Sequence, residues 1–247
     1  SILTTFGILF SILFEAIEFF KLRSFWYFIT GATWSPGVIG SQFGALPIFA
    51  GTFVITIIAL GVAIPVGLGS AIYMSEYASA NIRDYLKPLL EILAGIPTVV
   101  YGFFAAITVA PLVVQIAEFF GLEATFNSAL ASGVVMGIMI IPVISSLSDD
   151  VIRAVPDSQR KAAFALGMTH GETIKNIVLP SAMPGIISAS LLGLSKALGE
   201  TMIVVMAAGL RPNLSWNPLE DMTTVTVTIV NSLVGDFEFN SPETLSA

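Results

Sequence analysis

The sequence of 247 residues is 55% hydrophobic and only 11% charged, with a mean hydropathy of +0.89. Because a soluble domain carries about a quarter charged residues, this composition predicts an all-α protein whose helices cross a lipid bilayer several times. The net charge of −7 argues against a nucleic-acid partner held through its phosphates. The chain has no cysteine and one histidine, His170, which excludes a disulfide framework, a cysteine-ligated metal and a histidine cluster.

Several apolar segments of the sequence are long enough to form membrane helices. There are five of them, and they cover residues 4–20, 46–73, 89–114, 128–147 and 185–210. The first segment contains Glu15 and Glu18, and we expect both near a membrane interface because carboxylates are costly at the centre of a bilayer. Aromatic residues after Lys21 and Arg23 suit the headgroup region.

The second segment is uncharged, and Pro65 is expected to kink it. A polar link follows, in which Glu76, Arg83, Asp84 and Lys87 favour a short interfacial helix.

The third segment contains Gly95, Pro97, Gly102 and Pro111, with Glu91 at its polar end. Backbone groups freed by such residues need protein or water around them at membrane depth. We therefore expect this helix inside the bundle.

The fourth segment carries Gly133 and Gly137, a spacing that permits close contact between helices. The tail at 212–247 is polar and acidic, and Thr and Val alternate over 222–230, which by period predicts a strand. Since an isolated strand does not span a bilayer, we interpret this stretch as a lipid-edge or outer-surface segment of uncertain type. The chain starts without Met and shows no signal peptide, so we expect one or both ends of the natural protein to extend further.

Basic residues predict the orientation in the membrane. Three lie on one side of the expected helices, at Lys21, Arg23 and Arg211. Six lie on the other side, at Arg83, Lys87, Arg153, Arg160, Lys161 and Lys175. The side with six is expected to be cytoplasmic, and it includes the loop at 160–180.

Motifs for enzymatic chemistry are absent from the sequence. It has no G-x-x-x-x-G-K-[ST] phosphate loop, no zinc-binding histidine pair and no nucleophile elbow. We therefore expect no catalytic residues and no nucleotide hydrolysis by this chain itself.

The polar loop at 160–180 reads as two short helices. Residues 160–166 are rich in alanine and favour a helix, Gly167 ends that helix and permits a positive φ, and 170–178 forms a second helix that Leu179 and Pro180 terminate. Such a loop could transmit a push from a partner. An ordinary amphipathic connector is the alternative.

Lys196 and Glu200 are the ionisable pair of the fifth segment, four residues apart on one predicted helix face. Ionisable groups within a membrane usually mark a substrate or ion path. Lys196 could attract an oxyanion, Glu200 could accept a hydrogen bond from a protonated one, and the hydroxyls of Ser195 and Thr201 could donate to it. A pair that only neutralises itself and supports packing is the alternative.

The 160–180 loop resembles the EAA loop of ABC-importer permeases, which fits a groove on a separate ATPase. The resemblance rests on the spacing of Ala162, Ala163, Gly167, Ile177, Leu179 and Pro180, with Lys161 where glutamate is usual. It implies that these residues, together with His170, couple the chain to that ATPase.

The run KALGETM at 196–202 is similar to the RALGETM signature of phosphate-specific permeases of the PstC type, with Lys196 in place of arginine. Stretches at 43–47, 91–102, 141–142 and 153–156 agree with the same family, and the resemblance extends over about residues 34–235. It implies a type I (MetI-like) ABC importer permease that moves phosphate through a bacterial inner membrane.

The resemblance also implies partners. These are a second permease of the PstA type, a dimeric ATPase of the PstB type that binds ATP and Mg, and a periplasmic phosphate-binding protein of the PstS type. It divides the chain into a first helix with an outer loop (1–43), a core transmembrane domain (44–235) and a polar tail (236–247) that leads to a sixth helix beyond the sequence.

Other functions remain open at this point. The chain could be a permease for molybdate, tungstate or sulfate, or a scaffold that senses phosphate without conducting it. A secondary transporter driven by ions is a weaker candidate, because it would not require the spacing of the loop.

Overall fold

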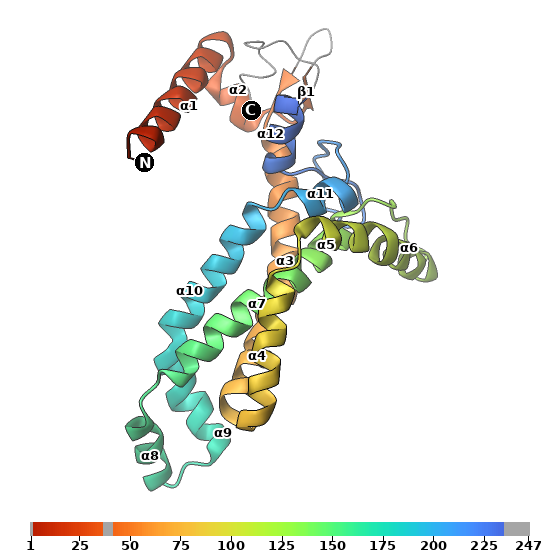
Figure 1. Ribbon diagram of the computed structural model, residues 1–247. Coiled ribbons are helices and arrows are strands. Elements are labelled where there is room, and N and C mark those ends of the chain that lie inside the picture. The colour runs from red at the N-terminus through yellow and green to blue at the C-terminus, as the bar shows by residue number, and fades with distance from the viewer. Residues whose placement is uncertain (1, 37–41, 235–247) are drawn as a thin grey trace.

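The computed structural model describes residues 2–36 and 42–234, and helices dominate this part of the chain (Figure 1). The α-helices are α1 (Ile2–Leu22), α2 (Phe25–Thr30), α3 (Leu46–Ile72), α4 (Ala80–Ala94), α5 (Thr98–Phe104), α6 (Ala110–Phe119), α7 (Ala129–Arg153), α8 (Asp157–Ala165), α9 (His170–Thr173), α10 (Leu179–Leu198), α11 (Met202–Ala207) and α12 (Val225–Val234). Two-residue strands β1 (Trp34–Ser35) and β2 (Gln42–Phe43) pair antiparallel. Wider π-helical turns occupy Tyr73–Tyr77, Ala105–Val109 and Ile174–Val178.

Four helical spans within the described residues are long and apolar enough to cross a membrane. They are Leu46–Tyr77, Thr98–Phe119, Ala129–Arg153 and His170–Leu198. The first predicted segment is also helical, as α1. The prediction of an all-α membrane protein is therefore confirmed, and α3 continues through Pro65. The predicted tail at 236–247 lies outside the described residues.

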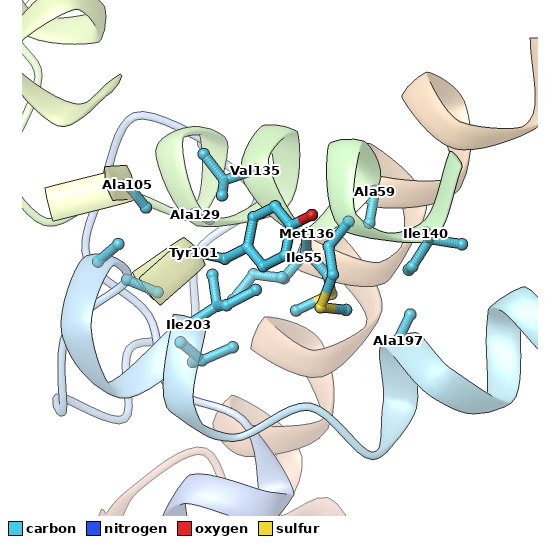
Figure 2. Packing of buried hydrophobic residues seen from close by; sticks show 14 of the residues in the cluster. Ile55, Ala59, Tyr101, Ala105, Ala129, Val135, Met136, Ile140, Ala197 and Ile203 are labelled. Carbon is cyan, nitrogen blue, oxygen red and sulfur yellow. The ribbon is translucent and has the colours of Figure 1, made fainter. Parts of the chain in front are cut away.

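The core forms where α3 and α7 cross. A Cβ atom added to Gly133 would lie 2.7 Å from Cγ2 of Ile58, and one added to Gly137 would lie 2.8 Å from the backbone oxygen of Ala59. The predicted close contact at these two glycines is confirmed. Ile55 of α3, Met136 of α7, Tyr101 of α5 and Ile203 of α11 fill the same cluster (Figure 2).

The third predicted segment is corrected in two ways. Instead of one helix over 89–114, α4 ends at Ala94, the chain turns through Gly95 and Pro97, and α5 begins at Thr98. Pro97 disfavours helical geometry at the residue before it, which explains the turn. The helix predicted for the polar link is confirmed as α4, which is longer than expected, while its position at a membrane interface stays a prediction.

The same segment does not lie inside the bundle formed by this chain. Only 17% of its most apolar window is buried. Gly102 serves a single close approach to α11, where an added Cβ would lie 2.7 Å from Sδ of Met206. Gly102 therefore serves one contact face, while Gly95 and Pro97 form the turn between α4 and α5.

Most of the Thr and Val alternation at 222–230 is helical, because α12 begins at Val225, and 222–224 precede it without regular structure, so the strand predicted from its period is wrong. A helix satisfies its own backbone groups, which an isolated strand cannot do in lipid. Thr228 Oγ1 also donates to the backbone oxygen of Thr224 one turn earlier (2.9 Å), so this hydroxyl is accommodated within the helix.

Ion pairs gather at one end of the molecule. Arg83 in α4 contacts Asp149 in α7, and Arg160 in α8 contacts Glu76 in the turn after α3. The end of α1, which has Lys21 in its last turn, lies at the opposite end with α2 and α12 (Figure 1). The two groups of basic residues used to predict orientation are thus separated in space, while the side that faces the cytoplasm stays a prediction.

Candidate functional site

The 160–180 loop begins within α8 and turns at Gly167. Gly167 has φ +82, a left-handed conformation that favours glycine. The next helix is capped by Thr169, whose backbone N–H donates to Glu172 Oε2 (2.8 Å) while its Oγ1 accepts from the N–H of Glu172 (3.4 Å). The predicted first helix and the left-handed turn at Gly167 are confirmed.

Leu179 and Pro180 do not end the second helix, which corrects the prediction. α9 continues through the π-helical turn Ile174–Val178 into α10, so His170–Leu198 is one span. Pro180 lies in the first turn of α10 directly after the wider turn, where a missing N–H is tolerated. α9 is therefore continuous with a candidate membrane span.

The residues predicted to couple the chain to an ATPase do not form one surface. Ala162, Ala163, Ile177 and Pro180 line a groove of about 530 Å³ between α8 and the start of α10, and Ala163 is buried there. Leu179 packs against a hydrophobic cluster at the end of α7. Lys161 and Gly167 are exposed to solvent instead.

His170 is half-exposed and turns toward the end of α3. Its Nε2 lies 3.8 Å from Oε2 of Glu76, and its ring stacks near Phe164 and meets Tyr77 edge to face. We call Glu76, Arg160, His170, Tyr77 and Phe164 the Glu76 cluster. No local sequence pattern joins Glu76 to its partner Arg160, because the two residues are 84 positions apart in the chain.

A second ionic contact joins α4 to α7 beside the loop. Arg83 Nη2 lies 2.7 Å from Oδ2 of the fully buried Asp149, and Lys87 pairs with Asp150. The hydrogen bond to Asp149 raises the pKa of Arg83, and the nearby carboxylates add to this while burial opposes it. The guanidinium therefore stays charged and fixes α4 to the end of α7.

Lys196 and Glu200 do not share a helix face, so the predicted arrangement is wrong. α10 ends at Leu198 with Gly199 as its cap, and Glu200 follows in the break before α11. Among residues 2–36 and 42–234, no ion pair joins Lys196 to Glu200. The low helix propensity of glycine favours the break. Because the two side chains do not pair, a self-neutralising ion pair does not explain their presence in this segment.

Glu200 is 7% exposed, and its carboxylate binds the start of α11. Oε1 accepts from the backbone N–H groups of Met202 (3.1 Å) and Ile203 (3.3 Å), which have no partner within the helix. The backbone oxygen of Glu200 accepts from Thr226 Oγ1 of α12 (2.9 Å). The break between α10 and α11 is therefore a fixed structure that also holds α12.

The other predicted pathway residues surround this break. Lys196 is half-buried in the last turn of α10, where a positive charge complements the carbonyl end of the helix. Ser195 is exposed and Thr201 is half-buried. The break thus brings a cation, a carboxylate and two hydroxyl side chains to the junction of two helices. Across the described part of the chain, no three His, Asp or Glu side chains gather as a metal site.

Comparisons with known proteins agree on one family. Residues 63–229 match the family described as "Binding-protein-dependent transport system inner membrane component". The chain is 35% identical over 216 residues to "Probable ABC transporter permease protein YqgH" of Bacillus subtilis, covering 87% of this chain and 68% of that protein.

Two further relatives carry a phosphate name. "Phosphate transport system permease protein PstC 1" of Mycobacterium tuberculosis is 33% identical over 249 residues, covering 89% of this chain and 73% of that protein. "Phosphate transport system permease protein PstC" of Mesorhizobium japonicum is 33% identical over 232 residues, covering 87% and 70%.

A solved structure shares the fold. It is described as inward-facing conformations of the MetNI methionine ABC transporter, with a TM-score of 0.53 and 19% identity, and the match covers 64% of this chain and 72% of that one. At this identity the likeness concerns the fold alone, and it confirms the predicted MetI-like permease fold.

Proposed function

This chain belongs to the family of binding-protein-dependent transport system inner membrane components, and from that premise we propose that it carries inorganic phosphate across the inner membrane of a bacterium. It is a permease subunit of an ABC importer and not itself an enzyme. The substrate, the individual partners and the roles of single residues are part of the proposal.

The 160–180 loop carries the proposal of coupling to a separate ATPase. Its two helices meet at the turn that contains the left-handed Gly167, and the second of them, α9, continues without interruption into α10. A partner that binds the exposed side of the loop, around Lys161 and Gly167, would therefore act on a membrane span directly. In this proposal ATP and Mg are bound by a dimeric PstB-type ATPase, which leaves this chain with no cofactor.

Phosphate is favoured as substrate by the relatives named for phosphate transport. The chemistry near the helix break agrees, because Lys196 supplies positive charge, and Ser195 and Thr201 supply hydroxyl donors for phosphate oxygens. Glu200 lies one residue before Thr201 and can accept from a protonated phosphate. We propose that these residues border the substrate pathway, completed by a PstA-type permease and supplied by a PstS-type binding protein.

Another oxyanion is the second candidate substrate. The name of the Bacillus subtilis relative gives no substrate. Lysine at position 196 is a compact charge that lacks the planar fork with which arginine binds phosphate in two places. A less selective pathway would follow from that difference.

Uptake by the reconstituted complex tests the proposal. Vesicles that contain this chain, the second permease and the ATPase, with ATP trapped inside at the ATPase side and the binding protein supplied outside, should accumulate labelled phosphate. Excess unlabelled phosphate should compete, whereas molybdate, tungstate and sulfate should not. Competition by one of those anions alone would assign a different substrate, and ATP-independent or absent accumulation would contradict the transport function.

A further inference from the structure

We infer that Glu76 is a positioning residue that holds both short helices of the 160–180 loop against the end of α3. Through this contact, the binding of a partner to the loop is linked to movement of α3, α7 and α10. The inference rests on the proposed function, in which that partner is an ATPase.

The first contact of Glu76 reaches α8. Arg160 Nη1 lies 2.6 Å from Oε1 and 2.7 Å from Oε2 of Glu76, whose side chain is only 4% exposed. Arg160 Nη2 also donates to the backbone oxygen of Ile152 in the last turn of α7 (3.0 Å). One guanidinium therefore ties α8 to the ends of two membrane spans.

The second contact reaches α9. His170 Nε2 lies 3.8 Å from Glu76 Oε2. The imidazole ring packs edge to face with Tyr77, with centroids 5.3 Å apart, and stacks near Phe164 of α8, with centroids 6.3 Å apart and planes 17° apart. Glu76 and its neighbour Tyr77 thus contact both helices of the loop at once.

Backbone irregularities flank the same point. Glu76 lies within the π-helical turn Tyr73–Tyr77, and the π-helical turn Ile174–Val178 begins directly after α9. Such turns are rare and occur frequently at functional sites. One π-helical turn contains Glu76, and the other follows the helix that His170 begins. Both spans therefore depart from regular α-helical geometry where the loop attaches to them.

Stability alone is a weak reason for this ion pair. A buried ion pair is often no more stabilising than a well-packed apolar pair, because both charges lose their hydration. A guanidinium that binds both oxygens of one carboxylate does fix orientation, since its donors are rigid and planar. Orientation of the loop is what the transmission of a push requires.

The test measures how many ATP molecules are hydrolysed per phosphate imported by the reconstituted complex. Glu76→Gln removes the charge and keeps the shape, and we expect this ratio to rise about threefold or more while the ATPase still co-purifies. Asp157→Asn is the matched control, because Asp157 approaches the same guanidinium at 3.8 Å but is 83% exposed. It should leave the ratio unchanged.

A double-mutant cycle with Arg160→Gln keeps the inference falsifiable if Glu76→Gln alone does not assemble. The double variant buries no unpaired charge, so it should assemble, and its ratio should be raised above that of the wild type to the same extent as in the single variants and no further. A wild-type ratio in the double variant, equal loss of hydrolysis and uptake in the Glu76→Gln variant, or effects of the two changes that add would overturn the inference. A wild-type complex that couples no hydrolysis to uptake would instead contradict the proposed function.

Discussion

Arg83 donates two hydrogen bonds to a single oxygen of Asp149, from Nη2 at 2.7 Å and from Nε at 3.2 Å. Asp149 is fully buried, while the Arg83 side chain is 18% exposed. The adjacent carboxylate, Asp150, pairs with Lys87 but is 53% exposed. Two neighbouring aspartates therefore make similar contacts with α4 at very different depths.

This difference predicts unequal effects of the same substitution. Asp149→Asn leaves a largely buried guanidinium without its charge partner and should lower the free energy of unfolding by about 2 kcal/mol. Asp150→Asn should lower it by less than about 1 kcal/mol, because the pair is exposed and screened. Thermal unfolding of the purified protein in detergent measures both. Equal losses would mean that burial of Asp149 does not determine its contribution.

A second prediction concerns the crossing of α3 and α7. Gly137→Ala adds a Cβ atom that would lie 2.8 Å from the backbone oxygen of Ala59, and a backbone atom cannot rotate away as a side chain can. We expect a loss of about 1–3 kcal/mol from overpacking. Unfolding in detergent provides the measurement.

The matched control for that change is Gly61→Ala in α3. No atom lies within 4 Å of a Cβ added there. Alanine favours a helix over glycine by up to about 1 kcal/mol, so this variant should be as stable as the wild type or more stable. A destabilised Gly61→Ala variant together with an unaffected Gly137→Ala variant would refute the described crossing.

Local patterns in the sequence predicted much of this fold. Long apolar runs identified the membrane helices, and the spacing of Gly133 and Gly137 identified a close helix contact. Gly167 identified the turn between the two loop helices. In each case a property of a few consecutive residues decides the structure.

Breaks between helices and distant contacts were not predictable in the same way. An uninterrupted helix would place Lys196 and Glu200 on one face, but α10 ends between them, with Gly199 as its cap. The break is stabilised by hydrogen bonds that Glu200 accepts from α11 and α12. The partnership of Glu76 and Arg160 depends on how α3 and α8 meet in space, which no local pattern encodes. The alternation of Thr and Val predicted a strand from its period alone, but no neighbouring strand pairs with it in the described residues, and its backbone groups are satisfied within the helix α12.

The turn at Gly167 provides a third prediction. Valine is strained at φ +82, at a cost of about 1–2 kcal/mol, so Gly167→Val should change the angle between α8 and α9. We expect phosphate uptake to be lost while insertion into the membrane and purified yield are retained. Gly171→Ala is the control, because Gly171 lies within α9 with open space around it. Normal uptake by the Gly167→Val variant would remove the coupling role of this turn.

The helix break provides the last prediction. Glu200→Gln keeps a carbonyl oxygen that can accept from Met202 and Ile203, so the fold and assembly should persist while phosphate transport falls.

Lys196→Gln removes the positive charge and should raise the phosphate concentration for half-maximal uptake by about tenfold or more, the value of one charge-assisted hydrogen bond. Lys196→Arg restores charge and adds a planar fork, so it should return that concentration to the wild-type value or below. If Lys196 only supported packing, the arginine and glutamine variants would not differ in their apparent affinity for phosphate. A difference between the two variants therefore indicates a role in the pathway. Unchanged uptake in both the Glu200→Gln and Lys196→Gln variants would assign the two residues to holding α10, α11 and α12 together and nothing more.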